Sequence, residues 1–221
     1  MRRPRSTFER VLAAPRWLDV LIVSTIVAAT ARALVMQTSV GQLALVDQWE
    51  RTALAFGRVV DDAGYSALQA WSSRAALYEV GMAVVNGPVA TIVLATGIFV
   101  IAGGARARAS LTQVLSVVAH ASVILALRQV VGAATTYFRE TTASATTLGS
   151  WFPGFDEASP VARFLGAIDL FIVWWAIVLA VGIATAYGFR VRRGLAFVLG
   201  TYVVGAIVMT VVTVALGGRT Q

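Results

Sequence analysis

Five ionisable side chains of this 221-residue sequence lie inside or beside long apolar stretches: Arg32, Glu79, His120, Arg128 and Asp169. A charge at the centre of a membrane helix costs at least about 2.5–3.5 kcal/mol, so such residues pair with one another or mark a path for ions. Two kinds of chemistry are therefore open. One is an ion pair that fixes neighbouring helices, and the other is a relay that moves a proton or an ion.

Asp169 is the only charged residue in the stretch FLGAIDLFIVWWAIVLAVGIATAYG, residues 164–188. Four small residues, each four positions after the last, follow it: Ala176, Ala180, Ala184 and Gly188. On a helix with about 100° per residue, the three alanines lie within about 60° of Asp169. Small residues at this spacing are typical of close helix packing in lipid. Asp169 is therefore predicted to point into a helix bundle.

Depth along the predicted helices favours Arg128 as the partner of Asp169, with Arg32 second. At a rise of about 1.5 Å per residue, Arg32 and Arg128 lie roughly 22 and 25 Å from the inner ends of their helices. Asp169 lies about 8 Å below the outer end of its helix, and Glu79 stands at the outer mouth of another. We therefore predict an ion pair. A transport relay, a carboxylate that reaches the outer interface, and a cap on the helix start are the alternatives.

Two further polar features lie inside predicted helices. His120 has Ser116 one turn away and is expected to hydrogen-bond a neighbouring helix, with proton transfer as the alternative. The sequence VNGP places Asn86 and Pro88 inside another apolar run. Proline removes a backbone donor and bends a helix, so a kink is predicted here. A broken helix that builds a transport site is the alternative.

The elements that must position these residues are membrane helices. Hydrophobic residues make up 58% of the chain and charged residues 13%, about half the charge of a soluble domain. Apolar runs of about 20 residues without alternation are typical of transmembrane helices. We predict an all-α polytopic membrane protein with five such helices, at residues 17–36, 81–102, 111–133, 164–187 and 195–216.

The distribution of arginine predicts the orientation of these helices. The residues 1–16 form a basic tail, and the second and fourth spans are followed by Arg106, Arg108, Arg190, Arg192 and Arg193. The positive-inside rule places all of them in the cytoplasm and the C-terminus outside. We expect the first span to stay uncleaved, in a cytoplasmic (inner) membrane. The five arginines of the connections could attract anionic lipid at about 1 kcal/mol each.

Two stretches lie outside the predicted spans of the membrane domain, residues 17–217. Residues 37–78 carry apolar residues at loosely helical spacing among charges of both signs. They are predicted to form an amphipathic segment at the outer interface, or else a loop helix packed on the ends of the bundle. Residues 135–160 have the composition of an irregular linker.

Signatures of catalysis are missing from the sequence. There is no cysteine, and no zinc motif, P-loop or nucleophile elbow occurs. We expect no enzyme activity, cofactor, metal or nucleic-acid partner. The expected partners are the lipid bilayer and a membrane protein or a second copy of the chain.

Three stretches resemble those of a known family. FLGAIDLFIVWWAIVLAVGIA is similar to the penultimate helix of bacterial Yip1-family membrane proteins, with matching residues Ile168, Asp169, Phe171, Trp174 or Trp175, Leu179 and Gly182. STFERVLAAPRWLDVLI and LTQVLSVVAHASVILAL resemble the family's amino-terminal entry and third helix. The resemblance implies five spans, a cytoplasmic N-terminus and no known catalysis. The small-residue faces, the outer stretch and the basic connections favour a membrane-organising or interaction component, with a small transporter or channel as the alternative.

Overall fold

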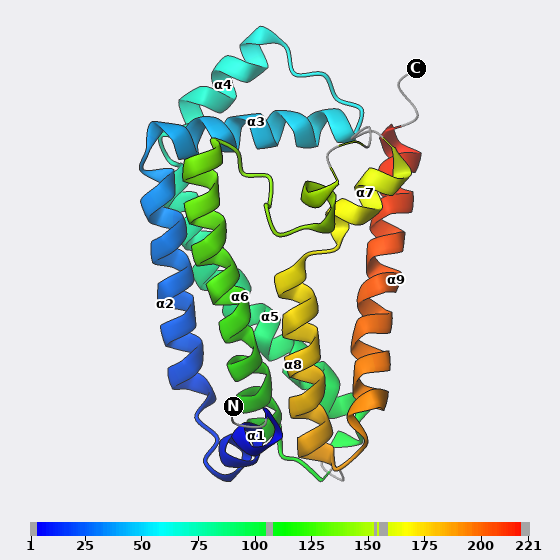
Figure 1. Ribbon diagram of the computed structural model, residues 1–221. Coiled ribbons are helices and arrows are strands. Elements are labelled where there is room, and N and C mark those ends of the chain that lie inside the picture. The colour runs from blue at the N-terminus through cyan, green and yellow to red at the C-terminus, as the bar shows by residue number, and fades with distance from the viewer. Residues whose placement is uncertain (1–3, 105–107, 153, 155–158, 218–221) are drawn as a thin grey trace. The chain divides into compact units, whose positions relative to one another are not determined.

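The computed structural model describes residues 4–104, 108–152, 154 and 159–217, and these residues are helical and connecting segments with no β-strand. The all-α prediction is confirmed (Figure 1). The elements in chain order are α1 (Pro4–Ala13), α2 (Trp17–Met36), α3 (Ser39–Ala55), α4 (Asp62–Ser72), α5 (Ala75–Ile101), α6 (Leu111–Arg139), η2 (Leu148–Trp151), α7 (Pro160–Ala167), α8 (Leu170–Tyr187) and α9 (Val191–Gly217).

Four helices in the described part of the chain are long and apolar enough to cross a membrane: α2, α5, α6 and α8. They correspond to the first four predicted spans. The fifth predicted span, 195–216, lies in α9, which is helical over 27 residues. The presence of a fifth span and the orientation of the termini stay predictions.

The helices α5 and α6 each extend beyond one end of the predicted span. α5 begins at Ala75 instead of 81, and only the turn at Ser73 and Arg74 separates it from α4. α6 continues to Arg139 instead of 133. The hydroxyl of Thr135 donates to the Gly132 carbonyl at 3.0 Å, so this polar residue is satisfied within the helix.

The predicted span 164–187 is wrong in one respect, because two helices replace a single one. α7 ends at Ala167 and α8 begins at Leu170. Between them Ile168 and Asp169 are non-helical, and Asp169 forms an antiparallel β-bridge with Thr147. The hydroxyl of Ser159 accepts from the Ala162 N–H, and Pro160 follows at the first helical position, so α7 has its own start signal.

The chain divides into two compact units. Unit 1 comprises Met1–Ala28, Met82–Arg128 and Phe171–Tyr202, and unit 2 comprises Ala29–Gly81, Gln129–Leu170 and Val203–Gln221.

Unit 1 is built around an apolar cluster in which α1 takes part. The cluster combines Phe8 and Val11 of α1 with buried residues of α6 and α8, including Val117 and Leu179. Phe8 is only 4% exposed, and burial of such a side chain from water contributes about 1.5–3 kcal/mol. Residues 4–13 of the predicted tail therefore form a docked helix, a feature that sequence analysis missed.

Unit 2 contains α3 and α4 where an amphipathic segment, 37–78, was predicted. Both helices begin with side-chain caps, in which Thr38 accepts from Gly41 N–H and Asp61 accepts from Gly64 N–H. Figure 1 shows α3 running across the ends of α2 and α6. Glycine is required at position 41 because a Cβ there would lie 2.1 Å from the Val35 carbonyl oxygen. The placement of these helices at a membrane interface stays a prediction.

Candidate functional site: polar groups of the membrane helices

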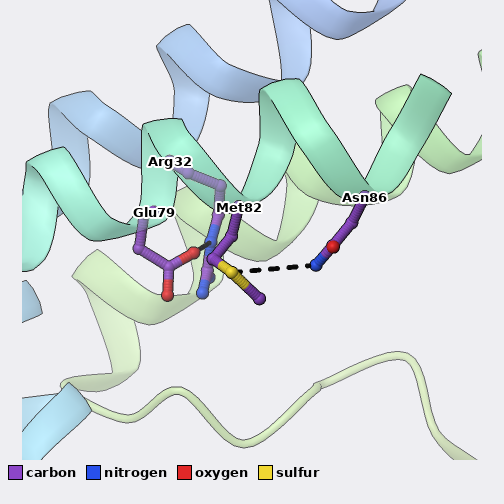
Figure 2. A network of polar contacts seen from close by, with 4 residues as sticks. All are labelled: Arg32, Glu79, Met82 and Asn86. Carbon is purple, nitrogen blue, oxygen red and sulfur yellow. Dashed lines mark hydrogen bonds and ion pairs between the residues drawn. The ribbon is translucent and has the colours of Figure 1, made fainter. Parts of the chain in front are cut away.

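The first polar pair joins the segments of α2 and α5 that lie in unit 2. Nε of Arg32, on α2, donates to Oε2 of Glu79, on α5, at 3.0 Å (Figure 2). The two side chains are 19% and 15% exposed, so the ion pair is partly shielded from solvent. Arg32 was the second-choice partner of Asp169, and the structure instead pairs it with Glu79. Neutralisation by a carboxylate lets both charges sit at the ends of apolar helices.

Asp169 is buried, at 2% exposure, and its carboxylate accepts hydrogen bonds from two hydroxyls. Oδ2 lies 2.8 Å from Thr146 Oγ1 and 3.2 Å from Ser144 Oγ. Hydrogen bonds to an ionised acceptor are among the strongest in proteins. Asp169 therefore holds the segment after α6 against the start of α8.

The break between α7 and α8 leaves backbone groups that the same segment satisfies. Leu148 N–H donates to the Ile168 carbonyl at 2.8 Å, and Leu170 N–H donates to the Thr146 carbonyl at 3.0 Å. Non-helical backbone at membrane depth is tolerated only where protein or a cavity provides such partners. Asp169 also stands immediately before α8, the position of a helix cap, which was one of the alternatives.

Sequence analysis missed Ser144 and Thr146 as partners of Asp169. The signal was the hydroxyl-rich stretch TTASATT, residues 141–147, which was interpreted only as a linker. A cluster of hydroxyls is unusual beside apolar spans, and it matches the need of a buried carboxylate for donors.

The predicted ion pair between Asp169 and Arg128 stays a prediction. Arg128 belongs to unit 1 and Asp169 to unit 2.

His120 makes its hydrogen bond within its own helix. Nδ1 lies 2.8 Å from the Ser116 carbonyl oxygen one turn earlier, so Nδ1 carries a proton, because a carbonyl only accepts. The expectation of a bond to a neighbouring helix is therefore not met among the described residues. The hydroxyl of Ser116 is fully buried and has no hydrogen-bond partner in the described part of the chain.

Asn86 and Pro88 lie inside α5, which continues through both residues. The side chain of Asn86 is exposed, and its amide contacts only Met82 Sδ, at 4.0 Å, in the described part of the chain (Figure 2). Sulfur is a weak acceptor, so the amide is almost unsatisfied. The predicted kink at Pro88 stays a prediction.

In the predicted small-residue stripe, the three alanines are buried and the glycine is exposed. Ala176, Ala180 and Ala184 are at most 2% exposed. Gly188 is exposed and lies beyond the end of α8 with φ of 71°, a conformation that glycine adopts readily where a helix ends. The close approach occurs instead at Gly182, where a Cβ would lie 2.5 Å from Val117 Cγ1 and 2.9 Å from Phe8 Cε1.

Exposed arginines gather on the connecting segments of unit 1 and at the start of α9. Those predicted to meet anionic lipid are Arg108, Arg190, Arg192 and Arg193, all exposed, whereas Arg106 lies outside the described residues. Three more exposed arginines flank or belong to α1: Arg5, Arg10 and Arg16. The Arg108 guanidinium lies beside Gly188, so the connections before α6 and after α8 are adjacent.

A capping box anchors α6 beside α1 in unit 1. Ser110 N–H donates to Gln113 Oε1, Gln113 N–H donates to Ser110 Oγ, and Gln113 Nε2 donates to the Leu12 carbonyl at 3.1 Å. The pattern Ser-x-x-Gln is a known start signal. Sequence analysis did not identify this cap.

The comparisons with known proteins bear on the whole chain. The family model described as Yip1 domain matches residues 1–213. Comparisons with curated proteins and with solved structures find no match. The Yip1 family is a membrane protein family that is not known as enzymatic. The match covers nearly all of the sequence and confirms the resemblance carried by the Asp169 stretch, so the chain belongs to the Yip1 family of membrane proteins.

Proposed function

We propose that this protein is a non-catalytic component of a bacterial cytoplasmic membrane that binds anionic lipid headgroups through the basic end of unit 1. Binding would gather anionic lipids, and through them other membrane components, around the helix bundle. The observation that carries this proposal is a set of seven exposed arginines among the described residues of unit 1: Arg5, Arg10, Arg16, Arg108, Arg190, Arg192 and Arg193.

Few acids oppose these arginines. The acids of unit 1 are Glu9 and Asp19. Nε of Arg5 lies 3.7 Å from Glu9 Oε1, in a pair whose side chains are 67% and 60% exposed. Such a pair is worth little in water and leaves most of the positive charge available. Each arginine near an anionic surface contributes about 1 kcal/mol of attraction.

The docking of α1 favours a prearranged basic surface. Phe8 and Val11 are buried in the cluster of unit 1, while Arg5 and Arg10 on the same helix are exposed. The helix is also tied through the Leu12 carbonyl to Gln113. Lipid binding would therefore require little ordering of the chain, which reduces the entropic cost of association.

The proposal includes five spans with the N-terminus in the cytoplasm, supported by the basic end of unit 1 and the positive-inside rule. The chain has no cysteine, so Arg2→Cys and Arg219→Cys report single positions. An impermeant maleimide added to intact cells should label position 219 and leave position 2 unlabelled. Labelling at 2 alone would reverse the orientation.

Lipid selectivity tests the function directly. The purified protein in mild detergent, mixed with phosphatidylglycerol and phosphatidylcholine, should retain phosphatidylglycerol in native mass spectrometry. Replacement of Arg190, Arg192 and Arg193 by Gln should lower that affinity by about fivefold per arginine. The matched control replaces Arg51, Arg58 and Arg74 of unit 2 and should change it little. Equal retention of both lipids would refute the proposal.

A small transporter or channel that uses Arg32, Glu79, His120, Arg128 and Asp169 is the alternative. The observation that favours it is the break at Ile168 and Asp169, because discontinuous helices build ion sites in transporters. Proteoliposomes distinguish the two functions. An ion flux that Asp169→Asn abolishes would favour transport, and vesicles that stay sealed would favour membrane organisation.

A further inference from the structure

An unsatisfied amide lies near the middle of the candidate span α5. Asn86 stands 11 residues after Ala75 and 15 before Ile101, or about 17 and 23 Å from the two ends of the helix. The hydrocarbon core is about 30 Å thick and α5 is about 40 Å long, so Asn86 lies inside the core when the helix is centred in it. Its exposed amide has only the weak contact with Met82 Sδ among the described residues. An amide in hydrocarbon without partners is costly.

Asn86 belongs to a regular exposed seam along the part of α5 that lies in unit 1. The seam residues are separated by four and three positions in turn, and all are exposed: Met82, Asn86, Val89, Val93, Thr96 and Val100. Val93 and Val100 are 65% and 64% exposed. This spacing is the heptad pattern of two helices that pack with knobs into holes.

The residue types on this seam match those of a two-stranded pair. With Asn86 at an a position, Val93 and Val100 also occupy a positions, where β-branched residues favour two strands. A single polar residue at an a position fixes register and partner number. Thr96, at a d position, is one of the small residue types that permit close approach of a second membrane helix. A different face of α5, which includes Ala95, packs into the core of unit 1 and is not available.

We propose that α5 is the dimer interface of this protein, on which a second copy of the chain pairs through Asn86. Copies inserted in one membrane share their orientation, so a twofold axis along the membrane normal places equivalent residues opposite each other. The two Asn86 amides then meet at one depth, and each donates an N–H to the oxygen of the other. The amide is self-complementary, which is why a second copy fits this seam. The interface is independent of the basic surface proposed above.

Cysteine cross-linking in membranes tests the seam, since the chain has no native cysteine. Val89→Cys, at a d position, should form an intermolecular disulfide with a mild oxidant. The control Val84→Cys is also exposed, at 52% against 52% for Val89, but lies about 140° around the helix from it. It should cross-link little. Equal cross-linking at both positions would refute the proposed face.

The amide itself is tested in purified protein reconstituted at increasing lipid-to-protein ratios, with energy transfer between labelled copies. Asn86→Leu should weaken association about 3- to 30-fold, the range found for hydrogen bonds between membrane helices. Val93→Asn adds a second amide to the seam and should strengthen association, whereas Val84→Asn should not. The gain from Val93→Asn remains informative if Asn86→Leu fails to fold. The proposal would be overturned if the protein stays a single copy at every ratio, or if neither Asn86→Leu nor Val93→Asn changes the strength of association.

Discussion

The two compact units differ in charge and in the kind of contact that stabilises them. Unit 1 holds eleven arginines against two acids, a net charge of +9, and unit 2 holds seven arginines against nine acids, a net charge of −2. The arginines of the unit 1 connections are exposed. In unit 2, by contrast, three of the charged groups are shielded from solvent: the Arg32–Glu79 pair is partly buried and Asp169 is buried.

The difference extends to packing. An apolar cluster from α1, α5, α6 and α8 forms the core of unit 1, whereas the apolar cluster of unit 2 is smaller, and the amide of Gln42 donates to the carbonyl of its member Met36. We infer that unit 1 depends mainly on close packing and unit 2 on charge-assisted hydrogen bonds. Mutations that remove a polar partner should therefore act most in unit 2, and those that disturb packing most in unit 1.

The largest effect is expected for Asp169→Ala in unit 2. Loss of the carboxylate removes the acceptor of both hydroxyls. Ser144 Oγ and Thr146 Oγ1 lie 2.8 Å apart, so one hydroxyl can donate to the other and the second is left unsatisfied, at a cost of about 1–3 kcal/mol. Thermal unfolding in detergent should show a lower midpoint and a lower folded yield. Asp169→Asn retains an oxygen acceptor and should lose less. An unchanged midpoint for Asp169→Ala would show that the hydroxyl contacts do not stabilise unit 2.

The matching test of packing in unit 1 is Gly182→Ala. The added methyl would meet Val117 Cγ1 and Phe8 Cε1, and overpacking of a close contact costs about 1–3 kcal/mol. Gly97→Ala is the control, because nothing lies within 4 Å of its Cβ position. It should be neutral or stabilise by up to about 1 kcal/mol through helix propensity. Equal midpoints for both variants would show that α1 is not tightly docked.

The span α2 and the basic ends of unit 1 could be predicted from the sequence for simple physical reasons. The apolar run of α2 starts at Trp17 and stops before the polar residues Gln37 and Thr38, so hydropathy alone defines the helix. The exposed arginines follow from the same principle, because charges beside apolar runs stay at the membrane surface. The family resemblance rested on the same apolar stretches.

The break at Asp169 could not be predicted from hydropathy. Its cause is a set of hydroxyl groups 23 and 25 residues earlier in the chain, and a hydropathy pattern does not record which distant groups donate. The cap at Ser159 and Pro160 was a local signal that α7 starts on its own. The docking of Phe8 was missed for a related reason, since the space above Gly182 exists only after α6 and α8 have packed.

A smaller loss of stability is expected when an ion pair is broken, and each unit has one pair that can be tested. Glu79→Gln removes the acid of the partly shielded pair and should cost about 1–2 kcal/mol, because the charge of Arg32 is no longer neutralised. Glu9→Gln removes the acid of the exposed pair in α1 and should cost less than about 0.5 kcal/mol. Unfolding midpoints of the two variants check the order. A larger loss for Glu9→Gln would contradict the difference between the units.

The smallest effect concerns the acidic surface of unit 2 at Tyr65, on α4. Partial burial, followed by the negative charges of Asp47 and Glu50, raises the pKa of the Tyr65 phenol above its usual 10.0. The folded state thus favours the neutral phenol. The contribution of this group to folding stability is present below pH 10 and is lost as the pH rises through the raised pKa. Ultraviolet titration at tyrosinate wavelengths, with Tyr65→Phe as the reference, isolates this group. Asp47→Asn should move the transition to lower pH, since it removes the negative charge that lies 3.5 Å from the hydroxyl. A transition that Asp47→Asn leaves in place would show that the acids of α3 do not act on α4.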